Sequence, residues 1–154
     1  MQKALLLVMA AGAAIGLAWP SGPAPAGQEA APRGEMRESV LERSEGGHFY
    51  ANVEVNGQLV RFLVDTGAYT VALAEKDARR IGIPFDPSEY EQVGVGASGP
   101  VRGKPVTLAR VDLDGKVAQG VSGAILEGSE ISLLGQNFLG RFSIEMRGDT
   151  MRIY

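Results

Sequence analysis

The chain has 154 residues, of which 45% are hydrophobic and 21% are charged, and its formal net charge is -3. Its 15 Lys and Arg residues are outnumbered by 18 Asp and Glu residues, so we expect no nucleic-acid partner. The absence of cysteine excludes disulfides and a thiol nucleophile. The only histidine, His48, is not accompanied by other residues at metal-ligand spacing, so we expect no metal and no other cofactor.

The first 26 residues are predicted to direct export. Lys3 precedes sixteen uncharged, mostly apolar residues, 4–19, and the helix-breaking Pro20 follows them. This stretch is slightly shorter than the ~20 residues that span a bilayer, and the small residues of 24–26 predict a cleavage site before Gly27. A cleaved signal peptide and an uncleaved membrane anchor both stay open. Either one would deliver the rest of the chain across the cytoplasmic membrane, to the periplasm.

Residues 27–46, rich in Ala, Glu, Arg and Gly, are predicted to form a polar linker. Within this range, residues 39–45 are compatible with a short helix or with disorder, and the sequence does not decide between them. Residues 47–154 are rich in Gly, Val, Leu and Ile, which favours one small, strand-rich domain. A domain of ~100 residues buries only about two thirds of its unfolded surface, so association would be a natural source of stability.

The first predicted hairpin of this domain leads to an acidic residue. Residues 47–57 alternate apolar and polar side chains and end in an Asn-Gly pair, which favours a two-residue turn. The returning strand, 59–64, runs directly into Asp65, so we expect this carboxylate at a strand end, partly removed from water. Gly67 has no Cβ and therefore lets a second backbone segment approach closely.

The middle of the domain is predicted to contain a short strand at 71–73 and a helix at 74–81 that stops at Gly82. Residues 92–101 are punctuated by glycines, which favours a mobile hairpin. Two further hairpins follow, with strands at 106–113 and 117–126 and at 142–146 and 151–154.

Two segments together resemble the hallmarks of a known enzyme clan. The first, 62–70, places an apolar pair before Asp65-Thr66-Gly67-Ala68. The second, 131–139, lies about seventy residues later and places an apolar pair before Gly135 and a short helix. Both resemble the pepsin-like and retroviral aspartic proteases. The resemblance covers about residues 46–154 and is strongest to the bacterial, single-domain, retropepsin-like branch whose members are exported or membrane-associated.

This resemblance implies an all-β, retropepsin-like acid protease fold, with one closed, barrel-like lobe per chain and one or two short helices. It implies a strand that ends at Gly135 and crosses closely beside the Asp65 loop, with Asn137 capping the helix that follows. It also identifies residues 92–101 as the flap, which closes over bound peptide and excludes water. A plain surface hairpin is the alternative for that segment.

The resemblance further implies an aspartic endopeptidase that acts on a peptide or protein substrate. In such enzymes two carboxylates share one proton and activate a water molecule for attack on the peptide carbonyl. This sequence offers one Asp-Thr-Gly, and its other aspartates lack that setting, so the second Asp65 would come from a homodimer. The catalytic residues carried over are Asp65, Thr66 and Gly67. The substrate-binding residues carried over are Ala68, Tyr69, Val95, Gly96, Ala97, Ser98 and Gly99.

This sequence departs from the family pattern at two positions that bear on the dimer and the groove. Tyr69 replaces a small residue, and Gln136 replaces an Arg that helps to hold retroviral dimers. The linker and the last strand also give no sign of an interdigitated terminal sheet, so we expect a weak dimer. We expect an apolar groove with walls from Val71, Val95, Val101 and Leu126.

Two other classes of function stay open. One is a catalytically inactive peptide-binding module that keeps the groove and the flap, and the bulky Tyr69 argues for it. The other is a structural envelope domain, tethered to the membrane through residues 4–19.

Overall fold

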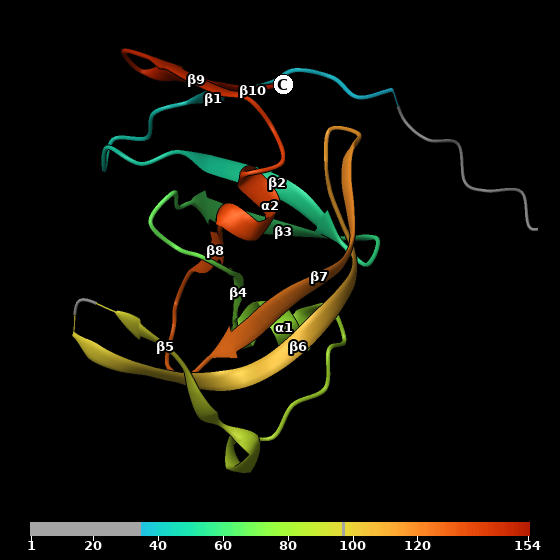
Figure 1. Cartoon of the computed structure of the whole chain (residues 1–154), viewed down its shortest axis with the longest axis vertical. Helices are drawn as coiled ribbons and strands as arrows, with labels where there is room; N and C mark the ends of the chain where they lie inside the picture. The colour runs from blue at the N-terminus through green and yellow to red at the C-terminus, as the bar shows by residue number, and fades with distance from the viewer. Residues whose placement is uncertain (1–34, 97) are drawn as a thin grey trace, which may run out of the picture. The chain divides into compact units, whose positions relative to one another are not determined.

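The structure is a computed structural model that describes residues 35–96 and 98–154. Most of the described chain is β-structure (Figure 1). The strands are β1 (Ser39–Glu42), β2 (Tyr50–Val55), β3 (Gln58–Val64), β4 (Val71–Ala74), β5 (Glu91–Gly96), β6 (Gly99–Leu113), β7 (Lys116–Leu126), β8 (Ser132–Leu134), β9 (Ile144–Arg147) and β10 (Thr150–Ile153). The helices are α1 (Glu75–Arg80), α2 (Gln136–Leu139) and the 3-10 turn η1 (Pro87–Glu89).

Six strands close into a barrel in the order β2-β3-β8-β4-β7-β6. The barrel closes because β2 pairs back onto β6, with Glu54 opposite Asp112 and Val55 opposite Val111. β5 extends this sheet beyond β6, with which it forms an antiparallel hairpin. Alternate side chains of each strand point inward and fill the barrel. Fully buried members of this core include Val53, Val60, Phe62, Leu73, Leu108, Val111, Ile125 and Leu134. The predicted all-β, barrel-like fold with two short helices is confirmed.

The predicted turns are confirmed in their backbone geometry. The turn between β2 and β3 has positive φ at Asn56 (52°) and Gly57 (80°), and the turn between β6 and β7 has positive φ at Asp114 (51°) and Gly115 (84°). Two consecutive positive φ angles are typical of the turns whose twist matches a two-stranded hairpin. α1 ends before Gly82, which has a φ of 75°, as predicted for a helix stop.

A second, three-stranded sheet has the order β1-β10-β9. β1 pairs with β10 in antiparallel register, from Ser39 opposite Ile153 to Glu42 opposite Thr150. The prediction of a linker over 27–46, with a helix or disorder at 39–45, is therefore wrong for Ser39–Glu42, which form a strand. Ser39 is buried and Leu41 packs against the core, whereas the intervening Val40 is exposed. A four-residue strand offers too little alternation for detection, and it depends on a partner at the other end of the sequence.

The turn of the β6–β7 hairpin is hydrogen-bonded to the segment that leads into β1. The Arg37 N–H donates to the Asp114 carbonyl over 2.9 Å. The Ser39 hydroxyl donates to the Asp114 carboxylate, and the buried Lys116 ammonium donates to the Arg37 carbonyl. Burial lowers the pKa of the Lys116 amine, while the nearby Asp114 opposes that shift. These contacts show that residues 37–42 belong to the folded body.

No helix within residues 35–96 and 98–154 is long and apolar enough to cross a membrane. The predicted signal peptide or anchor, residues 1–26, lies outside the described residues, as does the linker up to residue 34.

Candidate active site

Asp65 lies immediately after β3 and begins a tight turn. Its N–H donates to the Leu134 carbonyl over 3.1 Å, which joins the turn to β8. Its carboxylate oxygen Oδ1 accepts hydrogen bonds from the N–H groups of Gly67 (2.9 Å) and Ala68 (3.2 Å). The side chain is half-buried, and Thr66 beside it is exposed. Two backbone donors therefore fix the orientation of the Asp65 carboxylate before any ligand arrives.

β8 lies between the two strands that flank this turn. It runs parallel to β3, with Val64 opposite Leu134, and antiparallel to β4, with Ala72 opposite Leu133. At its end, a Cβ added to Gly135 would collide with the Thr70 carbonyl group, lying 2.6 Å from the carbonyl carbon. The prediction that Gly135 permits a close crossing is confirmed.

α2 is tied to the loop that follows Asp65. The Gln136 N–H donates to the Ala68 carbonyl over 2.8 Å, and the Asn137 N–H donates to the Tyr69 carbonyl over 2.9 Å. The Gln136 side-chain amide also donates to the Thr66 carbonyl over 3.1 Å. The glutamine at the position of the retroviral arginine thus braces the loop of its own chain.

Asn137 does not cap α2, so that prediction is wrong. The N-cap is Gly135, without a side-chain hydrogen bond. The Asn137 side chain instead accepts from the Val71 N–H over 3.0 Å and donates to the Ser122 carbonyl over 2.6 Å. Its two hydrogen-bonding ends therefore join β4 to β7 beneath the Asp65 loop.

A cleft of about 680 Å³ lies between this loop and the hairpin formed by β5 and the start of β6. Of the predicted site residues, Gly67, Ala68, Tyr69 and Val95 line it. Tyr69 and Val95 are strongly exposed, at 82% and 76%. The side chains of Tyr69 and Val95 therefore expose apolar surface to water within one cleft, which is typical of a ligand site.

The other predicted site residues lie beside the cleft or outside the described residues. Asp65 and Thr66 sit in the same loop as the lining residues, and Gly96, Ser98 and Gly99 form the hairpin end, but none of these five belongs to the lining. Ala97 lies outside the described residues.

The predicted walls of the groove are partly right. Val95, Val101 and Leu126 line the cleft, whereas Val71 is fully buried and does not. Sequence reasoning missed the floor of the cleft, which β6, β7 and β8 supply through Pro105, Ser122, Gly123, Ala124 and Leu133. Only Leu133 carried a signal, because it lies in the second hallmark segment.

The base of the candidate flap is held by a buried tyrosine. The Tyr90 hydroxyl donates to the Glu75 carboxylate of α1 over 2.8 Å, and Arg102 donates to the Tyr90 carbonyl over 3.1 Å. Burial, and then this hydrogen bond to Glu75, raise the pKa of Tyr90 to about 12. The candidate flap is thus anchored at its base, while Val95 near its end stays exposed.

His48 is exposed and lies in the turn before β2. Within the part of the chain that the structure describes, no group of three His, Cys, Asp or Glu residues is placed to hold a metal ion.

Comparison with known proteins identifies the family. The family of gag-polyprotein putative aspartyl proteases matches residues 51–141, which include both hallmark segments up to the end of α2. This chain belongs to the retropepsin-like aspartic protease family. A crystal structure of a retropepsin-like aspartic protease from Rickettsia conorii is similar to this retropepsin-like chain, with a TM-score of 0.64 and 33% sequence identity. The similarity covers 76% of this chain and 90% of that one.

Two relatives are uncharacterized proteins. One, from Rickettsia prowazekii, is 36% identical over 109 residues, which are 70% of this retropepsin-like chain and 47% of the relative. The other, in the cobV 5' region of a Sinorhizobium species, is 30% identical over 121 residues, which are 77% of this chain and 52% of the relative. The chain therefore spans about half the length of these relatives.

Proposed function

We propose that this protein is an aspartic endopeptidase in which Asp65 supplies the catalytic carboxylate. The observation that carries the proposal is the hydrogen bonding of Asp65, whose Oδ1 accepts from two backbone N–H groups in a loop that lines the cleft. A carboxylate that is held in place by the backbone suits proton transfer, because the base must meet its proton in a fixed geometry. Membership of the family supports the same assignment.

The proposed chemistry needs two carboxylates close together. Two carboxyl groups this close together cannot both be ionised, so the pair holds one proton. The ionised carboxylate would take a proton from a water molecule as the water oxygen bonds to the peptide carbonyl carbon. The protonated carboxylic acid would donate to the carbonyl oxygen, which gives a tetrahedral gem-diol. The first carboxyl group would then pass the proton that it took from water to the amide nitrogen as the C–N bond breaks, while the second carboxylate takes back a proton from a gem-diol hydroxyl, so that the amine and the carboxylic acid product leave and the pair again holds one proton.

We propose that the second carboxylate is Asp65 of another copy of this chain. Asp77, the aspartate of α1, is hydrogen-bonded to Ser132 (2.7 Å) and to Arg80 (3.0 Å). Asp112 and Asp114 lie at the turn of the β6–β7 hairpin, and the strands of this hairpin pair with each other there and not with the Asp65 loop. A twofold axis beside the Asp65 loop would bring the two copies of this residue together.

The terminal sheet bears on the strength of that dimer. β10 already has a partner on each side, β1 and β9, within one chain. An exchange of terminal strands between subunits would have to replace these pairings. We therefore propose a weak dimer whose contacts centre on the loop that carries Asp65 and the exposed Thr66.

The test is cleavage of unstructured peptides by the full chain. Asp65→Asn, which keeps the size of the side chain but removes the charge, should abolish cleavage. Activity per molecule of the wild type should rise with protein concentration. If the wild type binds peptides but cleaves none, the peptide-binding module favoured by the exposed Tyr69 replaces this proposal. If it neither binds nor cleaves, the structural domain is the better account.

We also propose that residues 1–26 direct export to the periplasm. The support is the sequence pattern of Lys3 followed by an apolar stretch and small residues. Fractionation of expressing cells, with sequencing of the amino terminus of the recovered chain, distinguishes a cleaved signal peptide from a retained anchor. Recovery of the full chain only in the cytoplasm would contradict export.

A further inference from the structure

The cleft beside the Asp65 loop (the Asp65 cleft) carries a single charge in its lining. Among the described residues that line it, Glu91 is the only charged one, and the others are apolar, hydroxyl-bearing or glycine. Glu91 begins β5 and lines the cleft together with Val93 and Val95, because alternate residues of a strand point to the same face. Glu91 is also exposed. The Asp65 cleft therefore presents one water-accessible carboxylate next to apolar walls.

The cations nearest to Glu91 in the hairpin are engaged with other carboxylates. Arg102 and Lys104 of β6 alternate with cleft-lining residues of the same strand, so they point to the opposite face. Arg102 pairs with Glu127 at 3.2 Å, and Lys104 pairs with Glu89 at 2.7 Å. In the described parts of the chain, 35–96 and 98–154, Glu91 takes part in no ion pair. No described side chain therefore neutralises its charge.

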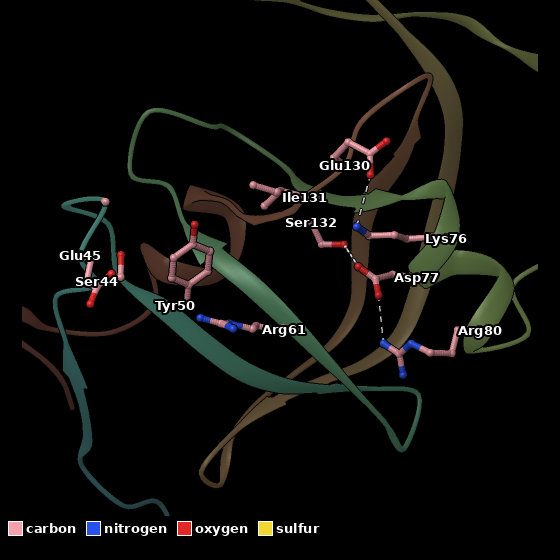
Figure 2. Close-up of a pocket in the computed structure, with 11 residues that line it drawn as sticks. Ser44, Glu45, Tyr50, Arg61, Lys76, Asp77, Arg80, Glu130, Ile131 and Ser132 are labelled. Atoms are coloured by element: carbon pink, nitrogen blue, oxygen red, sulfur yellow. Dashed lines mark hydrogen bonds and ion pairs between the residues drawn. The ribbon is translucent and has the colours of Figure 1, made fainter.

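A second pocket, between the turn that follows β1, β3 and α1, has no such excess of charge (Figure 2). Its volume is about 640 Å³, close to that of the Asp65 cleft. Three cationic side chains in its lining are matched by three carboxylates: Arg61, Lys76 and Arg80, and Glu45, Asp77 and Glu130. Two of the cations are paired within the pocket, at 3.0 Å and 3.4 Å (Figure 2). Of the two hollows, the Asp65 cleft is the one whose lining favours a ligand of one sign, a cation.

Tyr69 adds an aromatic ring to the same cleft. It belongs to the loop that follows Asp65, whereas Glu91 belongs to the hairpin, and the cleft lies between these two segments. Tyr69 is 82% exposed. The cation–π contacts of the described residues use other rings, those of Phe49, Tyr50 and Phe85. The electron-rich face of the Tyr69 ring is therefore available to a cation that enters the cleft.

We propose that Glu91 and Tyr69 form a subsite for a basic side chain, Lys or Arg, of a peptide substrate. The long apolar stem of such a side chain would pack along the cleft walls, which include Val93, Val101 and Leu126, while its charged end meets Glu91. An ammonium or guanidinium group donates charge-assisted hydrogen bonds to a carboxylate. Because Glu91 keeps its contact with water, little desolvation opposes this pairing. The role in substrate choice rests on the proposed function, whereas binding of the basic side chain does not.

The test is fluorescence anisotropy with the full chain carrying Asp65→Asn, so that no peptide is cleaved and the charge of Asp65 cannot attract the ligand. The peptides have blocked ends, a neutral fluorophore and an apolar segment. One set carries a single arginine at successive positions, and the other carries citrulline there, which has nearly the same shape without the charge. At the best position the arginine peptide should bind about tenfold more tightly. This preference should shrink as ionic strength rises from about 0.05 M to about 0.5 M.

Substitutions of the two subsite residues should change the arginine preference in different ways. Glu91→Gln should reduce it about fivefold, and Glu91→Lys should abolish it. Tyr69→Leu should reduce it about twofold, whereas Tyr69→Phe, which keeps the ring, should leave it unchanged. Glu54→Gln is the matched control, because Glu54 is an exposed glutamate on β2, outside the cleft, and should leave the preference unchanged. Equal binding of the two sets at every position, or a preference that Glu91→Gln and Glu91→Lys leave undiminished, would overturn the inference.

Cleavage by the wild type separates this inference from the proposed function. An arginine preference in binding, without cleavage of any peptide, would support the subsite and contradict the endopeptidase. Cleavage of both sets with the same kcat/KM at every position would support the endopeptidase and contradict the subsite.

Discussion

Gly135 lies against the backbone of Thr70 so closely that a Cβ on Gly135 would overlap the Thr70 carbonyl group. This contact joins the end of β8 to the loop that carries Asp65. The same strand bonds to the Asp65 N–H through the Leu134 carbonyl. The second hallmark segment therefore acts as a support for the first, and the position of the Asp65 carboxylate depends on a residue without a side chain.

Gly135→Ala should lower the free energy of unfolding by about 3 kcal/mol, because the added methyl group meets a backbone that must move. Urea denaturation measures the loss. Gly94→Ala is the control: a Cβ there meets nothing within 4 Å, so its stability should be unchanged or slightly higher. Equal effects of the two substitutions would contradict the close crossing.

Asn137→Ala should lower the free energy of unfolding by about 2 kcal/mol, since the Val71 N–H loses its acceptor and the Ser122 carbonyl loses a donor. The exposed Asn52 of β2 provides a control, and Asn52→Ala should change stability by less than about 0.5 kcal/mol. Chemical denaturation compares the two. A result in which Asn137→Ala is as stable as Asn52→Ala would mean that the bridge between β4 and β7 contributes nothing.

The start of the folded domain can be tested by truncation. A chain of residues 35–154 should fold cooperatively, whereas one of residues 47–154 should be less stable or unfolded. The shorter chain loses β1, leaves one edge of β10 unpaired and removes the Arg37 carbonyl from the buried Lys116 ammonium. Circular dichroism with thermal melting measures both. Equal melting temperatures would show that residues 35–46 are dispensable for folding.

The hydroxyl group of Tyr90 should ionise at a higher pH than that of an ordinary tyrosine. Its pKa is raised to about 12 from an ordinary value of 10.0, so between these pH values the folded chain keeps a proton that the unfolded chain loses. The contribution of Tyr90 to stability is fully present below pH 10 and is lost as the pH rises through about 12. During a pH titration, the absorbance of tyrosinate should show a step near pH 12 that Tyr90→Phe removes. An identical titration curve in that variant would contradict the assignment.

Local signals explain what could be predicted from the sequence. Alternating side chains marked most of the barrel strands, and the Asn-Gly and Asp-Gly pairs fixed two turns through their positive φ angles. The Asp65 loop and Gly135 were predictable because two short patterns, each weak alone, occur together in the order and spacing of the family. The two hairpin turns depend little on distant contacts, whereas the Asp65 loop is held by the Gly135 segment, about seventy residues later in the chain.

The features that were missed all depend on distant partners. β1 is a strand only because β10 lies beside it. Val71 looks like a groove residue, but β4 is buried along its whole length between β7 and β8. Lys116, in a strand next to a turn, gives the pattern of an exposed residue, yet it is covered by the segment before β1.

The pocket lined by Arg61 and Lys76, between β3 and α1, is the clearest case of this kind. Arg61 and Lys76 appear in the sequence as ordinary surface charges on a strand and on a helix. Only the pairing of both β3 and β4 with β8 brings these two residues to one hollow. No short-range pattern connects residues that meet in this way.

The most direct test of the central claim, that one active site uses Asp65 from two chains, is activity after mixing wild-type protein with the Asp65→Asn variant. Total protein is held constant and subunits are allowed to exchange. In an equal mixture, only about one quarter of randomly formed dimers contain two aspartates, so activity should fall to about one quarter of that of the wild type alone. Activity that falls only to about one half, in proportion to the wild-type fraction, would show that each chain works alone and would contradict the account.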